Sequence, residues 1–264
     1  MTETTTRRGI ECKDHGSWHS YTIDGRRATG VTTALKGVPK QEILVPWAAK
    51  TVAEHVVDNI YDIKRMIDSG GRNPTIWYLK ELPNQVRDTA AVRGTAVHKI
   101  AEQIIRHEEV EVPEPLTAYV EGYLRYLEDF NPTTIAEELI VGSREHMVAG
   151  RLDSIQDIPA YGRSHVDYKT GKGVYGEAAL QVAAYRHMEV CVDAEGNEQP
   201  NIQVEHTFVL HLMPGEYELV PVQAGKDEFG QFLAALANYR ANVMSRRLDK
   251  LIGEPVEPPK RGAA

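Results

Sequence analysis

The second half of the chain constrains the fold most, because three β-rich segments follow one another there with only short turns between them. These segments are TTIAEELIVGS from residue 133, HMVAGRLDSIQDI from residue 146 and SHVDYKTG from residue 164. The patterns that follow predict a helix at about 177–191, strands at about 202–212 and 217–222, and an amphipathic helix at about 227–248. This succession predicts an α/β, or mixed α+β, domain in which helices flank a central mixed sheet.

The first half is predicted to be mainly helical after an opening hairpin. SWHSYTIDGRRATGV predicts two short strands joined by a turn at Asp24-Gly25. Helical spacing starts at Val45, with Pro46 in the first turn, and further helices are predicted at 74–82, 84–107 and 116–130. The predicted division is a hairpin and helical region (1–130), a core (131–250) and a flexible tail (251–264).

Composition excludes several classes of protein. The chain has 264 residues, 42% of them hydrophobic and 26% charged, which is the balance of an ordinary globular protein. It has no apolar run of about 18 residues, and MTETTTRRGI lacks the apolar core of a signal peptide, so we expect a cytoplasmic protein without a membrane partner. Cys12 and Cys191 are too few for a disulfide framework or an all-cysteine metal cluster.

Charge alone does not decide whether the partner is a nucleic acid. The net charge of −8 argues against one, because nucleic-acid binding usually depends on a basic surface. Bound divalent cations would reverse the local field of some acids. Basic residues scattered along the chain could line one groove or simply be spread over the surface: Arg26, Arg27, Arg93, Arg144, Arg151, Lys169, Lys172, Arg246 and Arg247.

A carboxylate and an ammonium stand two residues apart in the third β-rich segment, at Asp167 and Lys169. Side chains alternate along a strand, so both are predicted to project from one face. The ordinary alternative is an exposed ion pair that contributes little stability. The same spacing occurs at Glu11–Lys13 and Asp62–Lys64, so the tripeptide alone carries almost no information.

A second acid makes the pair more informative. If the second and third β-rich segments form a hairpin, Asp153 comes beside Asp167 on one face. Two carboxylates held together repel each other unless a cation or a proton lies between them. The arrangement therefore predicts a hard-cation site with oxygen ligands, for Mg²⁺ or Mn²⁺.

Two further signals lie on predicted helices. His98 offers an imidazole, which Mn²⁺ accepts more readily than Mg²⁺, although a lone helical histidine is usually a surface or core residue. Gln181 and Tyr185 are four residues apart and so share one helix face, which is an ordinary arrangement when it occurs alone.

The succession RGTAVH, GRLD, DYK and QVAAY resembles the motif series of the PD-(D/E)XK nuclease superfamily. The similarity is to the branch that includes the RecB nuclease domain and the exonucleases associated with CRISPR adaptation. It covers residues 93–185 at the level of motifs, and the order of elements extends it to about residue 212. The resemblance implies a restriction-endonuclease-like core and Mg²⁺- or Mn²⁺-dependent cleavage of DNA.

The resemblance also implies roles for individual residues. The implied metal ligands are His98, Asp153, Asp167 and the Tyr168 backbone carbonyl, while Lys169 would position or help deprotonate the attacking water. The implied DNA contacts are Gln181 and Tyr185, and the basic residues Arg93, Arg151 and Lys172 are further candidates. An acid on the preceding strand, Glu137 or Glu138, would join through water.

The chain departs from many members of this branch, which carry four cysteines around an iron–sulphur cluster. Two cysteines cannot supply that set, so the chain is more similar to cluster-free members from bacteriophages, in which a helical N-terminal part including VPWAAK (45–50) takes over the structural role.

The expected function is a DNA exonuclease in phage recombination, repair or processing, acting in the host cytoplasm on linear DNA. The alternatives are a flap- or branch-specific endonuclease and a catalytically silent DNA-binding module. Each of these three functions is compatible with a homo-oligomer or with a recombination partner.

Overall fold

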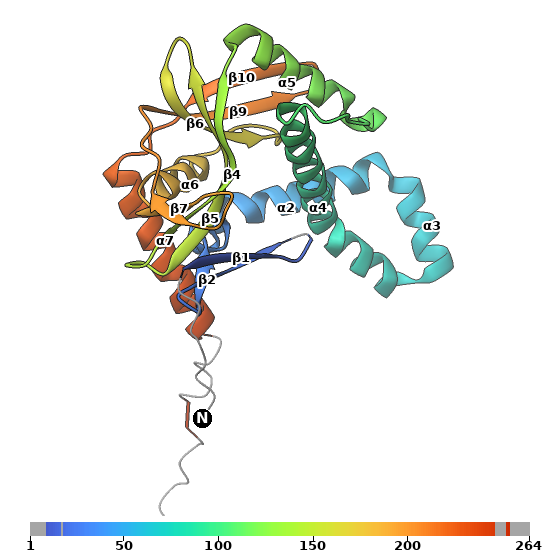
Figure 1. The fold of residues 1–264 in the computed structure, drawn as a ribbon. Helices are drawn as coiled ribbons and strands as arrows, with labels where there is room; N and C mark the ends of the chain where they lie inside the picture. Colours follow the sequence, from blue (N-terminus) through green and yellow to red (C-terminus); the bar gives the residue numbers. More distant parts are fainter. Residues whose placement is uncertain (1–8, 17, 246–251, 254–264) are drawn as a thin grey trace, which may run out of the picture.

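The computed structural model describes residues 9–16, 18–245 and 252–253. These residues form one branched mixed sheet covered by helices (Figure 1). The strands are β1 Ile10–Asp14, β2 His19–Ile23, β3 Arg26–Gly30, β4 Thr133–Ser143, β5 Val148–Ile158, β6 Gly162–Lys169, β7 Val190–Val192, β8 Glu198–Pro200, β9 His206–Met213 and β10 Glu216–Pro221. The helices are α1 Val31–Ala34, η1 Leu35–Gly37, α2 Gln41–Asp58, α3 Ile60–Gly70, α4 Arg72–Ile105, η2 Glu114–Leu116, α5 Thr117–Phe130, α6 Glu177–Arg186 and α7 Lys226–Ser245.

Strand β5 is the branch point of the sheet. One of its edges pairs with β4 along almost its whole length. The other edge pairs first with β3, in parallel, at Val148 and Ala149, and then with β6, antiparallel, from Ser154 onward. Between these two pairings, residues 150–153 of β5 have no partner strand on that edge among the described residues. The sheet therefore opens at Asp153.

Alternation along β6 separates a buried apolar face from a polar one. Val166 and Tyr168 belong to the core beneath α4 and α5. Asp167 and Lys169 therefore project to the opposite face, where Tyr185 of α6 packs with residues of β5 and α7. The helices thus cover the two faces in pairs, with α4 and α5 on one side and α6 and α7 on the other (Figure 1).

The mixed α+β character, the opening hairpin and the five longer strands of the second half are confirmed. β2 and β3 pair antiparallel around the turn at Asp24-Gly25. The boundary at residue 130 does not separate two cores, since Val97 and Ala101 of α4 share a core with Val166 of β6. The predicted tail lies outside the described residues apart from 252 and 253. None of the helices in the described ranges is both long and apolar enough to cross a membrane.

Proline was a poor guide to helix ends. The helices predicted at 74–82 and 84–107 are one helix, α4, with Pro83 inside it. Pro46 lies in the second turn of α2, which begins at Gln41 and not near Val45. A proline removes one backbone hydrogen bond, and a long helix tolerates that loss with a bend.

Three short strands were missed. β1, β7 and β8 have only three to five residues, too few to show alternation. The helix predicted at 177–191 accordingly ends at Arg186, because Val190–Val192 pairs with β4 as β7.

Gly37 permits the close approach of η1 and α7. A Cβ at this position would overlap the backbone carbonyl oxygen of Ala235 and lie 2.6 Å from the Tyr239 nitrogen. We expect Gly37→Ala to lower the free energy of unfolding by about 1–3 kcal/mol, because backbone atoms of a packed helix cannot move aside easily. Gly230→Ala, in α7 where a Cβ meets open space, is the matched control and should be neutral or slightly stabilising. Urea unfolding of both variants measures the difference, and equal stabilities would contradict this packing.

Candidate metal centre

The predicted site residues meet where the sheet opens beside β5. Asp153 comes from β5, Asp167 and Lys169 come from β6, and His98 comes from α4. The pairing of Ser154 with Val166 places Asp153 and Asp167 next in register, so the predicted hairpin is confirmed. Chain segments separated by more than 50 residues in sequence thus contribute to one site.

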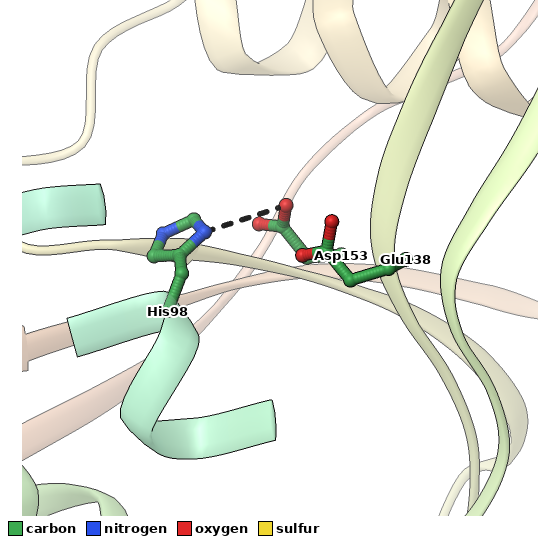
Figure 2. A group of neighbouring side chains, drawn as sticks. All are labelled: His98, Glu138 and Asp153. Atoms are coloured by element: carbon green, nitrogen blue, oxygen red, sulfur yellow. Dashed lines mark ion pairs between the residues drawn. The ribbon is translucent and has the colours of Figure 1, made fainter. Parts of the chain in front are cut away.

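His98 is held between the backbone of β6 and the carboxylate of Asp153. Its Nε2 lies 2.8 Å from the Tyr168 carbonyl oxygen, and its Nδ1 lies 3.6 Å from Asp153 Oδ1 (Figure 2). The Tyr168 amide donates a hydrogen bond of 2.7 Å to Asp153 Oδ2. Burial lowers the pKa of His98, but the Asp153 carboxylate outweighs this, and the net shift of the pKa is upward.

Asp153 and Asp167 are both buried, yet their pKa values move in opposite directions. Burial raises the pKa of Asp153, but His98, Lys169 and the Tyr168 amide together bring it below its usual range. Burial dominates at Asp167 and raises its pKa to about 6, against the opposing effect of Lys169. The neighbours of Asp153 therefore stabilise its ionised form, whereas those of Asp167 do not compensate for its burial.

Asp167 is fully buried and has one charged partner. Its Oδ2 lies 2.5 Å from Lys169 Nζ, which confirms that the two side chains share a face. Its Oδ1 has no hydrogen-bond donor among the described residues, and Lys169 Nζ is the charged partner of Oδ2. Buried carboxylates normally have their lone pairs satisfied, so the unpaired Oδ1 fits a site for a cation.

Glu138 faces Asp153 across β4 and β5. Its neighbours Glu137 and Leu139 pair with Ser154 and Leu152, and its own φ of 49° lies in the left-handed region, which is unusual for a strand residue. Burial raises the pKa of Glu138 to about 7. Ligand atoms of His98, Glu138 and Asp153 lie within 4.8 Å of one another (Figure 2).

The structure therefore distinguishes the two candidate acids of this strand. Glu138 lies beside Asp153, and Glu137 lies 4.0 Å from Arg106 instead. The atoms around the opening that could bind a metal ion are carboxylate oxygens, a backbone carbonyl oxygen and the imidazole nitrogen of His98. Oxygen ligands suit Mg²⁺ and Mn²⁺, and the imidazole favours Mn²⁺. The residues present thus fit the predicted cation.

Gln181 and Tyr185 share a face of α6, as predicted, but their environments differ. Gln181 Nε2 lies 3.4 Å from the Tyr185 hydroxyl. Tyr185 is only 2% exposed, and its ring lies 5.7 Å from that of His165. Stacking on a DNA base needs an open ring face, so the buried Tyr185 ring is not available for stacking, and a contact between Tyr185 and DNA stays a prediction. Its hydroxyl instead orients Gln181.

The predicted basic residues differ in their surroundings. Arg93 donates to the Thr170 carbonyl at 3.1 Å and lies over the ring of Tyr119. Arg144 forms ion pairs with Asp24 and Glu198, at the turn between β2 and β3. Lys172 is exposed in the loop after β6. Arg246 and Arg247 lie outside the described residues.

Arg151 and two histidines complete the surroundings of the centre. Arg151 Nε lies 2.6 Å from Glu138 Oε2, and a terminal nitrogen of Arg151 lies 2.8 Å from His19 Nε2. His165 is 1% exposed, and burial lowers its pKa to about 4. Sequence reasoning missed both histidines. Alternation could have found His165, because it is two residues before Asp167 on the same strand.

Comparisons with known proteins give no family for this chain. No family model matches it, and no curated protein matches it. A solved structure described as "Crystal structure of SSO0001" is similar at 15% identity, over 76% of this chain and 85% of that chain, with a TM-score of 0.32. A similarity at this level carries no argument about fold or activity.

Proposed function

We propose that this protein is a Mg²⁺- or Mn²⁺-dependent DNA exonuclease with a restriction-endonuclease-like core. The observation that carries the proposal is the fully buried Asp167 carboxylate, whose Oδ1 has no hydrogen-bond donor among the described residues and whose Oδ2 pairs with Lys169, where Asp153 and His98 converge. The order of these residues along the chain is the one that the motif resemblance predicts. The site therefore supports hydrolysis of a phosphodiester.

Phosphodiester hydrolysis needs an activated water, stabilisation of negative charge on the phosphate and help for a poor leaving oxygen. A bound Mg²⁺ or Mn²⁺ supplies all three when acids hold it beside the phosphate. His98, Asp153, Asp167 and the Tyr168 carbonyl would hold the ion, with Glu138 nearby. None of these proposed ligands is a cysteine.

Side chains of the protein would stabilise charge, position the water and bind the DNA phosphate. The Lys169 ammonium is held beside Asp167, and the side chain of Lys169 is about one-third exposed, so it can reach a phosphate at the opening of the site. There it would stabilise the developing charge and position the water that attacks. Gln181 is oriented by the Tyr185 hydroxyl and would donate its amide to a DNA phosphate.

The proposal is tested with end-labelled linear DNA and closed circular DNA of the same sequence, with Mn²⁺ or with EDTA. We expect release of labelled nucleotides from the linear DNA only, and only with Mn²⁺. Cleavage of branched or flapped substrates at internal positions would replace the exonuclease with the endonuclease alternative. Binding without any cleavage would favour the silent module.

His98→Ala should raise the metal concentration needed for half-maximal cleavage by at least about 10-fold, because the variant loses a direct ligand. The effect should appear in Mg²⁺ and in Mn²⁺. Metal titrations of the cleavage rate measure it. His55→Ala is a control, because His55 contacts Tyr78 in the helical region. If His98→Ala changes only the melting temperature, His98 is a structural residue.

Gln181→Ala should slow cleavage by up to about 100-fold, because a scissile phosphate displaced by about 1 Å reacts far more slowly. Tyr185→Phe removes the hydroxyl that orients Gln181 and should cause a smaller loss. Neither change should alter Mn²⁺ affinity, measured by calorimetry without DNA. An unchanged rate in Gln181→Ala would exclude the positioning role, and a large loss of Mn²⁺ affinity would move Gln181 into the metal site.

A further inference from the structure

A groove of about 570 Å³ lies between β2, β3 and the C-terminal half of α7. This volume is within the range of roughly 300–1,000 Å³ that is typical of ligand sites. The described residues that line it include no acid, although 38 of the 264 residues of the chain are acidic. The lining includes three aromatic rings, two arginines and a histidine: Trp18, Tyr21, Tyr239, Arg27, Arg240 and His19.

Trp18 presents a large aromatic surface to solvent in a fixed orientation. It is 54% exposed, and one face of its indole stacks on His15 with ring centroids 3.9 Å apart and planes 15° apart. His15 is in turn 2.9 Å from the Ser20 hydroxyl through its Nε2. Exposed aromatic side chains of this kind serve as stacking platforms for nucleic-acid bases.

The two arginines add positive charge to the groove. Arg240 is fixed at the wall by Thr29 Oγ1 and by the carbonyl oxygens of His146 and Met147, at 3.2, 2.9 and 3.0 Å. Arg27 is exposed and forms no ion pair within the described ranges. Asp14, 3.5 Å from His19 Nε2, borders the groove and is not part of its lining. Arginine beside an exposed aromatic side chain suits a nucleotide, whose base stacks and whose phosphate is anionic.

The groove is connected to the metal centre through two residues. His19, in the lining, contacts Arg151 at 2.8 Å, and Arg151 contacts Glu138 at 2.6 Å. Arg151 and Asp153 are two residues apart on β5 and so project from the same face. A strand lying in the groove can therefore continue over Arg151 to the proposed cleavage site.

We propose that this groove, the β2–β3–α7 groove, binds single-stranded DNA and directs it to the metal centre. Its place in the reaction rests on the proposed nuclease function. Stacking on Trp18 requires an unpaired base, because the faces of bases inside a duplex are already stacked on their neighbours. The groove thus selects a single strand, or a frayed end, over intact duplex.

The test measures binding of a fluorescently labelled oligo-dT to the whole protein in EDTA, so that no cleavage is needed. Trp18→Ala should weaken binding about 5- to 100-fold, the range for loss of one stacked base, and Trp18→Tyr should retain most of the affinity. Arg27→Gln should reduce the slope of log affinity against log salt by about 0.7, as expected for one phosphate contact to a single strand. Trp77→Ala is the matched control, because Trp77 is 66% exposed on α4 and far from this groove in sequence. It should leave binding unchanged.

The outcomes separate this proposal from the nuclease proposal. Trp18-dependent binding without any Mn²⁺-dependent cleavage would support the groove and overturn the nuclease. Cleavage by the parent protein with unchanged binding in Trp18→Ala would overturn the groove and leave the nuclease standing. Blunt duplex bound as tightly as oligo-dT, with no dependence on Trp18, would also overturn the groove. Circular dichroism of Trp18→Ala checks that the hairpin region is folded.

Discussion

Asp167→Asn should reduce cleavage of linear DNA by at least about 100-fold while leaving the protein folded. The change removes a charge from a fully buried group whose Oδ1 has no hydrogen-bond donor among the described residues, and it preserves the shape of the side chain. Loss of one preorganised group that stabilises charge typically costs about 100- to 1,000-fold in rate. Asp153→Asn should have a similar effect, because it would lose both its attraction for the cation and its pairing with His98. Initial rates on end-labelled DNA and thermal melting measure activity and folding.

Asp62→Asn is the matched control for these two variants. Asp62 belongs to an acid-x-Lys tripeptide on α3 and pairs with Arg65 at the surface. We expect the parental rate in this variant. A parental rate in Asp167→Asn would rule out the metal centre described above, whatever the behaviour of the other variants.

Lys169→Met should also reduce the rate by at least about 100-fold, but for a different reason. The variant keeps the carboxylates and loses the ammonium that faces the phosphate. The Mn²⁺ affinity should therefore be retained or increased, since a cation 2.5 Å from Asp167 Oδ2 no longer competes with the metal. Calorimetry with Mn²⁺ and cleavage assays together distinguish the two classes of variant.

Lys13→Met and Lys64→Met control for the loss of a lysine from the same short motif. Lys13 lies on β1 and Lys64 on α3, so neither should affect cleavage. A Lys169→Met protein that loses Mn²⁺ affinity together with activity would show that Lys169 supports the fold of the site and has no separate role in the reaction.

Alternation along strands was sufficient to predict the centre of the site. The spacing of Asp167 and Lys169 gave their common face, and the short turn before β6 gave the antiparallel partner that brings Asp153 alongside. Both inferences are local, because a strand and its hairpin partner are close in sequence. Alternation did not show which of Glu137 and Glu138 lies beside Asp153, because the orientation of Glu138 depends on its own left-handed backbone conformation within β4.

Features that depend on distant packing were out of reach. The burial of Tyr185 follows from the docking of α6 between β5 and α7, and no pattern around Tyr185 predicts it. The groove likewise joins Trp18 to Arg240, more than 200 residues later in the chain. In both cases the contacts depend on the arrangement of whole elements, which residue spacing within one segment does not specify.

The most direct test of the account is a crystal of the protein soaked with Mn²⁺ and a short oligo-dT, measured at a wavelength where manganese scatters anomalously. We predict an anomalous peak bounded by His98, Asp153 and Asp167 and by the Tyr168 carbonyl, with a phosphate of the strand against it and Lys169 beside that phosphate. The absence of a peak at this position, or a peak elsewhere in a crystal whose protein cleaves DNA, would contradict the account.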